Sequence, residues 1–242
     1  MISVYLLLDY CFQIERTHIE MNRRIVILGT AHRKNVGGNC SPDKKFYEYQ
    51  FSREVCFRVK KELEAAGFTV FIDLPDDLIQ GTQTEELRKR CRIVNGLCDH
   101  YGKHNCLYLS IHVNAAGSGR QWRTAGGWSV YTCKGQTESD RLATSLYEAA
   151  RIALADYANQ FEANKQHGLY DSKQRPFRTD HSDGDPDQEA NFYVLVHTKC
   201  AAALTENLFQ DNQADVAYLL SQQGLDSIVR LHVQGVLGYF GG

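Results

Sequence analysis

The sequence predicts a single α/β domain, built on a mostly parallel twisted sheet of about six strands with helices on both faces. Short apolar, β-branched runs alternate along the chain with amphipathic segments of helical period, which is the order expected when helices connect parallel strands. The run over residues 106–113 is nearly all apolar, which is typical of a central strand covered on both faces. A length of 242 residues is enough for one large domain of this class.

The first half of the chain predicts three strands and two helices. Residues 25–29 form a β-branched run that ends in glycine and predict a buried strand, and the polar residues 30–43 predict a loop. Apolar residues then recur at every fourth position, which predicts a helix over about residues 47–66 that ends at Gly67. Strands over residues 68–72 and 106–113 and a helix over residues 85–97 complete this half.

The second half predicts further strands and helices around a long acidic loop. We expect a strand over residues 128–133 and a long helix over residues 139–159. Residues 160–190 are polar and predict an exposed loop, in which Gly and Pro are interspersed with Asp180, Asp183, Asp185 and Asp187. Strands over residues 192–196 and 201–205 and helices over residues 214–221 and 225–239 follow.

The N-terminal residues 1–20 are expected to be an extension outside the core, with the domain itself spanning residues 21–242. The apolar run that begins the chain lacks a preceding basic segment and a small-residue cleavage site, and Asp9 interrupts it, so we expect no secretory signal. Met21 is a more plausible start of the chain, shortly before the first strand, and we expect the extension to be dispensable. The rival interpretation is that residues 4–8 pair as an extra edge strand or pack on the core.

Composition excludes some classes of protein. The formal net charge is −2, from 27 basic and 29 acidic residues, so no basic excess exists to neutralise nucleic-acid phosphates. No apolar run approaches the ~20 residues that a membrane-spanning helix needs. The eight cysteines contain no Cys-x-x-Cys pair, and several lie in apolar runs, so we expect reduced, buried thiols and synthesis in the cytoplasm.

Three polar residues coincide with the predicted carboxyl ends of strands, where the chemistry of such sheets usually lies. His32 follows the first strand, His112 ends the third, and Glu206 ends the sixth. A core histidine satisfied by a backbone carbonyl would give the same pattern at His112. A buried cation would satisfy several such groups at once, and imidazole nitrogen and carboxylate oxygen are suitable zinc ligands.

Five segments in order resemble the zinc-dependent N-acetylmuramoyl-L-alanine amidases of bacterial and phage cell-wall amidase type 3. The resemblance covers about residues 25–240. Its segments are SIHVNA (110–115), EANFYVL (189–195), Glu206-x-x-Phe209, the helix from Glu48 to KKELEAAGF (60–68), and Leu87 with Arg90 and Asn95.

The resemblance implies a catalytic role for particular residues. His32, Glu48 and His112 fall on the family's ligands to one zinc ion, and Glu206 falls on its catalytic glutamate. The resemblance thus implies metal-activated hydrolysis of the bond between N-acetylmuramic acid and L-alanine of peptidoglycan. The first motif departs from the family's Asp-Pro-Gly-His-Gly-Gly, because here it reads LGTAHRK (28–34).

The resemblance also implies a setting. We expect a monomer whose partner is peptidoglycan, with no nucleic-acid partner, acting on the cell wall as a phage or prophage endolysin or as an autolysin. Two other functions remain open: a zinc peptidase that acts on a stem peptide or another amide, and a non-catalytic peptidoglycan-binding protein with this fold. The presence of Glu206 beside three candidate ligands disfavours the second of these.

The remaining polar features are interpreted as structural. The other histidines lack a spacing argument and are expected at the surface or at caps; they are His18, His100, His104, His167, His181, His197 and His232. The acidic loop over residues 180–187 could bind calcium but lacks the EF-hand pattern, so we interpret it as a solvated flap. Arg33 and Lys34 are interpreted as solvated loop charges, with contacts to acidic stem peptides as the alternative.

Overall fold

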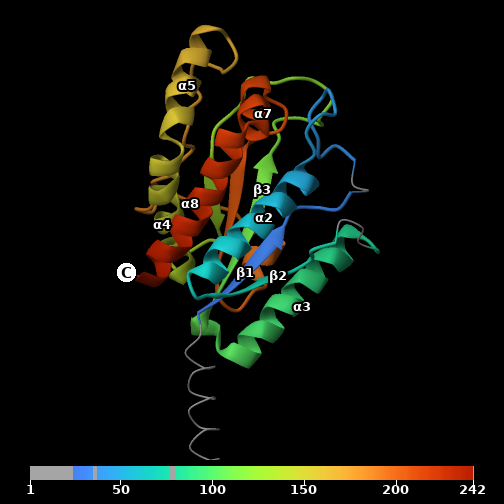
Figure 1. The fold of residues 1–242 in the computed structure, drawn as a ribbon, viewed down its shortest axis with the longest axis vertical. Helices are drawn as coiled ribbons and strands as arrows, with labels where there is room; N and C mark the ends of the chain where they lie inside the picture. The colour runs from blue at the N-terminus through green and yellow to red at the C-terminus, as the bar shows by residue number, and fades with distance from the viewer. Residues whose placement is uncertain (1–23, 35–36, 77–79, 242) are drawn as a thin grey trace, which may run out of the picture.

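The computed structural model describes residues 24–34, 37–76 and 80–241, and the expected N-terminal extension lies outside them (Figure 1). The described strands form a six-stranded sheet in the order β2-β1-β3-β6-β4-β5. All neighbouring strands are parallel except β4 and β6, which are antiparallel. The strands are β1 (Ile25–Thr30), β2 (Thr69–Ile72), β3 (Cys106–Asn114), β4 (Ser129–Thr132), β5 (Gln188–Glu189) and β6 (Ala201–Phe209). The predicted α/β class and mostly parallel sheet are confirmed.

Helices cover both faces of this sheet. They are α2 (Glu48–Ala65), α3 (Gln83–Tyr101), α4 (Glu138–Ala153), α5 (Ala155–Gln166), α6 (Tyr193–Val196), α7 (Gln213–Leu220) and α8 (Gln222–Gly241), with a 3-10 turn at Lys103–Asn105. In Figure 1, α2 and α8 lie in front of the sheet with α4 beside α8, and α3 runs apart from them on the other side of β1 and β2. Among the described helices, none combines the length and the apolar character that a membrane crossing needs.

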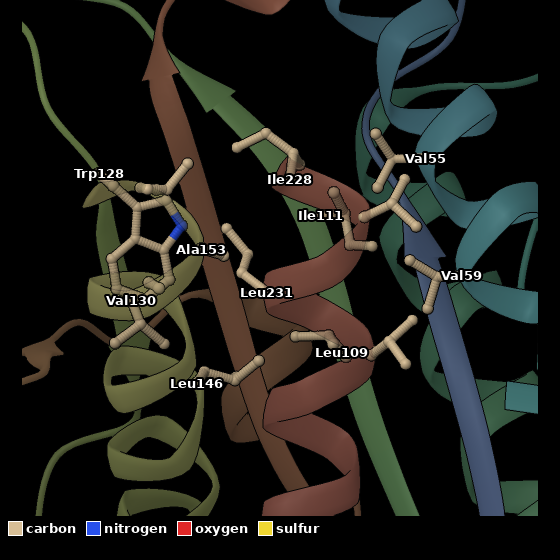
Figure 2. Packing of buried hydrophobic residues seen from close by; sticks show 14 of the residues in the cluster. Val55, Val59, Leu109, Ile111, Trp128, Val130, Leu146, Ala153, Ile228 and Leu231 are labelled. Atoms are coloured by element: carbon tan, nitrogen blue, oxygen red, sulfur yellow. The ribbon is translucent and has the colours of Figure 1, made fainter. Parts of the chain in front are cut away.

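Side chains along each strand point alternately to the two faces of the sheet, and each face has its own hydrophobic core. On the face of α2, α4 and α8, Leu109 and Ile111 of β3 belong to one buried cluster with apolar side chains of all three helices (Figure 2). On the opposite face, Ile25 and Ile27 of β1 pack with Val94 of α3. Both faces of β1 and β3 are therefore buried, which explains why these strands are nearly continuous apolar runs in the sequence.

Predicted helix ends agree with the structure where local chemistry determines them. Gly67 follows the last residues of α2 with φ +91°, a left-handed conformation that glycine adopts without a steric cost. Helix α3 begins two residues before the predicted Glu85, because Thr82 and Glu85 form a capping box in which each side chain accepts a hydrogen bond from the other's backbone.

Three predictions about the second half are wrong. Residues 192–196 are not a strand: residues 193–196 form the short helix α6, whose Val194 and Leu195 pack on α3. The predicted long helix breaks at Leu154 into α4 and α5 without a glycine or proline to mark the break, and α5 extends to Gln166 into the predicted loop. The apolar run over residues 192–196 is too short to distinguish the period of a strand from that of a helix, so its packing decides its structure.

The end of the loop also differs from the prediction. Residues 188–189 form β5 beside β4, and Asp187 is 2% exposed, so this end of the acidic segment is not a solvated flap. The cysteine prediction holds for the described residues, where Cys40, Cys56, Cys91, Cys98, Cys106, Cys133 and Cys200 are free thiols. Four of these are buried and three are half-buried.

Candidate active site

His32, Glu48 and His112 meet at the carboxyl end of β1 and β3. One ligand atom from each residue lies within 4.8 Å of the others. Glu48 Oε2 lies 3.5 Å from His32 Nε2, and Glu48 Oε1 lies 3.1 Å from His112 Nδ1. The two imidazole rings stand edge to face, with centroids 5.2 Å apart. The structure therefore brings together the three residues that the sequence analysis nominated as metal ligands.

Each of the three side chains is held by a different element. Glu48 is the first residue of α2 and is 2% exposed, and its Oε1 accepts a hydrogen bond from Val113 N (3.0 Å). His112 lies within β3, two residues before the strand ends. His32 lies two residues beyond β1, in a backbone conformation with φ +40° that is uncommon for a non-glycine residue. Such strain persists only where neighbouring contacts fix the backbone.

Arg53 of α2 supplies those contacts to the His32 backbone. Its guanidinium donates hydrogen bonds to the carbonyl oxygens of Ala31 (3.0 Å) and His32 (2.9 Å). Ser52 Oγ accepts a hydrogen bond from Ala31 N (2.8 Å) and donates one to Ile111 O (2.6 Å). These bonds fix the residues after β1 against α2 and β3 in place of the Pro and Gly that the motif lacks.

Glu206 lies beside His112 on the neighbouring strand. The two residues are register partners in the parallel pair of β3 and β6. The sequence analysis predicted that Glu206 ends its strand, but β6 continues to Phe209. The strand passes through an irregularity after Glu206, where Leu208 adopts φ +67°. Glu206 Oε2 is buried and has no hydrogen-bond partner among the described residues. A buried carboxylate oxygen without a donor is costly, and a bound ion or substrate would satisfy it.

Burial sets the protonation of two site residues. Burial raises the pKa of Glu206 well above its usual value, and the nearby Glu48 carboxylate raises it further. Burial lowers the pKa of His32, against the opposing effect of Glu48. A neutral imidazole is the form that ligates a metal, so the environment of His32 suits that role.

Three of the four residues, His32, His112 and Glu206, line a cavity of about 290 Å³. Its remaining lining comes from β1, β3, β6, α3 and α6: Thr30, Gln83, Glu86, Leu87, Arg90, Ser110, Phe192, Tyr193, Val194 and Leu204. A larger groove of about 720 Å³ lies along α2, α7 and α8, but it contains none of the four candidate residues. The smaller cavity is therefore the candidate active site.

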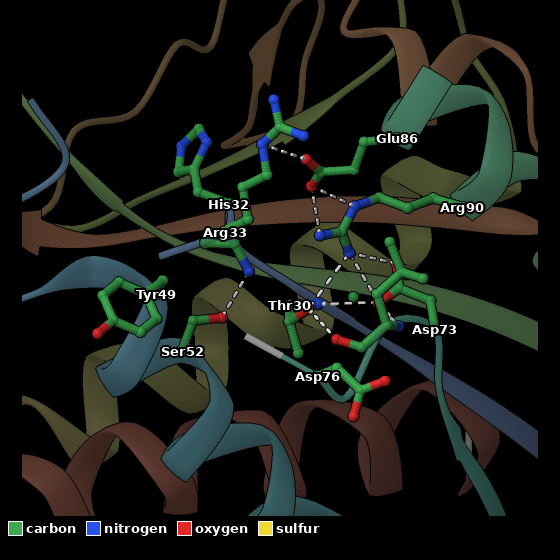
Figure 3. A network of polar contacts seen from close by, with 12 residues as sticks. Thr30, His32, Arg33, Tyr49, Ser52, Asp73, Asp76, Glu86 and Arg90 are labelled. Atoms are coloured by element: carbon green, nitrogen blue, oxygen red, sulfur yellow. Dashed lines mark hydrogen bonds and ion pairs between the residues drawn. The ribbon is translucent and has the colours of Figure 1, made fainter. Parts of the chain in front are cut away.

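A buried ionic network supports the α3 wall of this cavity (Figure 3). Arg90 Nη1 donates to both carboxylate oxygens of Asp73 (2.7 Å each), and Arg90 Nη2 donates to Glu86 Oε1 (2.8 Å). Asp73 also accepts from Thr30 N (3.2 Å) and from the Tyr108 hydroxyl (2.9 Å). The network thus ties α3 and the end of β2 to β1, two residues before His32.

Replacing Arg90 with methionine should lower the free energy of unfolding by about 3–5 kcal/mol, because two buried carboxylates then lose the cation that pairs with both of them. Urea denaturation followed by circular dichroism measures the change. The control is Arg88→Met, which makes the same substitution at an exposed position of α3. A loss no larger than that of the control would contradict a supporting role for the network.

The sequence analysis did not predict two features of the site. His232 is fully buried rather than at the surface: its Nδ1 donates to Ile228 O (2.7 Å), and its Nε2 accepts from Thr205 Oγ1 (2.8 Å), next to Glu206. Burial lowers its pKa to about 4, so it is neutral.

Arg33 is not simply a solvated charge, because it lies 3.8 Å from Glu86 Oε2 and donates to Gly81 O. Among the other histidines, His18 lies outside the described residues.

A sequence model described as N-acetylmuramoyl-L-alanine amidase matches residues 26–237. The chain belongs to this family. Membership supports amidase activity on peptidoglycan, and the His32, Glu48 and His112 group could hold the family's metal ion. No curated protein sequence matches the chain.

Solved structures of other amidases share the fold. The catalytic domain of CwlV from Bacillus (Paenibacillus) polymyxa var. colistinus is 19% identical, with a TM-score of 0.64 over 90% of this chain and 98% of that one. An amidase from Clostridium difficile 630 is 20% identical, with a TM-score of 0.68 over 91% and 98% of the two chains. The catalytic domain of the CD27L endolysin, which targets Clostridia Difficile, is 18% identical, with a TM-score of 0.58 over 89% and 97%.

Proposed function

We propose that this amidase is zinc-dependent and hydrolyses the amide bond between the lactyl carbonyl of N-acetylmuramic acid and the amine of L-alanine. The observation that carries the proposal is the convergence of His32, Glu48 and His112 within 4.8 Å beside the unpartnered Glu206 Oε2. In this proposal the first three residues bind one zinc ion and Glu206 is the catalytic carboxylate.

The donor set fits zinc. Two imidazole nitrogens and one carboxylate oxygen are the ligands of a catalytic zinc site that keeps a position open for water or substrate. The lowered pKa of His32 favours the neutral ring that such a site requires. When bound, the ion would polarise the scissile carbonyl and lower the pKa of a water molecule. Its positive charge would also offset the repulsion between Glu48 and Glu206.

Glu206 would move the proton in this reaction. One carboxylate oxygen accepts a proton from the attacking water, and the same carboxyl group then donates it to the departing amine of L-alanine. Burial of Glu206 favours the second transfer, because a carboxyl group with a raised pKa holds a proton at the pH where an ordinary glutamate would have lost it.

The cavity walls would position the substrate. Phe192, Tyr193 and Leu87 offer apolar and aromatic surface on the side of α6 and α3. Phe192 is 39% exposed, so it is available to contact a sugar or a stem peptide. We propose that the protein acts as a monomer. We propose the cell wall as the place of action, with the protein serving as a phage or prophage endolysin or as an autolysin.

Mass spectrometry of digested sacculi tests the bond that is cut. We expect glycan strands with free lactyl carboxyl groups and stem peptides with a free amine on L-alanine, and their formation should cease after chelation and return with zinc. Peptides cut at an internal bond would instead identify a zinc peptidase, and undigested sacculi would indicate a binding protein.

A further inference from the structure

Three aspartates gather on the other side of β4 from the zinc ligands, in a part of the molecule that the proposed mechanism does not use. They are Asp140 in the first turn of α4, and Asp185 and Asp187 ahead of β5. One carboxylate oxygen from each lies within 4.8 Å of the other two. Residues 45 positions apart in the chain are thus brought together by the pairing of β5 with β4.

One of these carboxylates is buried with an unsatisfied oxygen. Asp187 is 2% exposed, and its Oδ2 accepts a hydrogen bond from the Thr132 hydroxyl. Its Oδ1 is buried and has no hydrogen-bond partner among the described residues. Nearly all buried polar atoms in proteins have a partner, so such an oxygen indicates a missing water or ion.

Among the described residues, the cluster has no ion-pair partner. Within the described part of the chain, no lysine or arginine forms an ion pair with Asp140, Asp185 or Asp187, and the nearby Arg141 pairs with Glu138 instead. Burial and the nearby Asp185 carboxyl together raise the pKa of Asp187 to about 8. Three carboxylates that approach one another without a counter-charge repel, and a bound cation removes that repulsion.

We propose that Asp140, Asp185 and Asp187 form a calcium site. Its donors are all oxygens, which favours a hard cation over zinc. Calcium accepts six to eight oxygen ligands in irregular geometry and completes its shell with water, whereas magnesium requires a nearly ideal octahedron. Three carboxylates from a helix and a loop, rather than from a preformed regular cage, fit calcium better.

Calcium at this position would support one wall of the catalytic cavity. The backbone of the segment is already fixed to β4, since Ala190 N donates to Thr132 O (2.9 Å) and Glu189 Oε1 accepts from Gly135 N (2.6 Å). Phe192 follows Asp187 by five residues and begins the α6 wall. A cation that joins α4 to the Asp187 segment therefore stabilises the chain that presents Phe192 and Tyr193 to the cavity.

Calorimetric titration of the full-length, zinc-loaded protein with CaCl₂ tests the proposal. We expect one calcium ion to bind per chain, and a melting temperature that rises with calcium because the ion binds only the folded state. Asp187→Asn, which keeps the size of the side chain, should weaken calcium binding at least about tenfold and abolish the rise, since affinity follows the number of charged ligands. Asp185→Asn should act in the same direction.

Matched controls distinguish this site from others. Asp180→Asn makes the same substitution at an exposed position of the same loop and should leave calcium binding unchanged. His112→Ala should also retain it, because the calcium ligands lie outside the zinc site. The proposal is overturned if the wild type shows no calcium binding, if Asp187→Asn and Asp185→Asn bind calcium like the wild type, or if magnesium binds more tightly than calcium.

Discussion

Glu206→Gln should reduce hydrolysis of purified sacculi by about 10²–10⁴-fold, because it removes the group that accepts the proton from water. Zinc content should not change, since Glu206 is not among the three clustered ligands. The fold should not weaken either, because the amide has nearly the same shape and no longer repels Glu48. Turbidity of sacculi, metal analysis and thermal melting measure the three quantities.

The pH profile gives a second measurement on the same variant. A general base acts only when deprotonated, so wild-type activity should fall as pH falls through the pKa of Glu206, which burial raises above the ordinary glutamate value. The residual activity of Glu206→Gln should lack this dependence. Glu148→Gln is the control, because it makes the same change on the exposed face of α4. Activity of Glu206→Gln within a few fold of the wild type would show that another group is the base.

The sequence predicted the parts of the fold that local patterns determine. Strands β1 and β3 are apolar on both faces, and α2 has a regular period and a glycine after its end, so each leaves a signal in a short window of sequence. His32 and His112 were then placed correctly, because in a parallel sheet both lie at the same edge. The resemblance to an amidase family added Glu48, which no spacing argument had selected.

What the sequence could not predict depends on contacts between distant residues. The run over residues 192–196 forms a helix because Val194 and Leu195 pack on α3, and no local feature separates that outcome from a strand. His232 is buried because α8 packs across the sheet and places its ring against Thr205. The approach of Asp187 to Asp140 likewise depends on β5 pairing with β4, a strand of two residues that leaves no periodic signal.

His112→Ala should weaken zinc binding at least about 100-fold and remove hydrolysis with it. Loss of a residue that merely orients a ligand already costs about 10–100-fold in metal affinity, and here one of three ligands is lost. Zinc competition with a chelating dye measures the affinity, and turbidity of sacculi measures the activity. His100→Ala, at an exposed position near the end of α3, is the matched control and should leave both quantities unchanged.

The same substitution at His32 tests whether this residue is a zinc ligand although the sequence around it differs from the family's motif. The backbone at His32 is fixed by Arg53 rather than by neighbouring glycine, so the ring stays 3.5 Å from Glu48 despite the changed sequence around it. We therefore expect His32→Ala to lose zinc to a similar extent as His112→Ala. Full zinc retention in both variants would mean that the ion is bound elsewhere, whereas retention in His32→Ala alone would show that His112 and Glu48 bind it with a different third group.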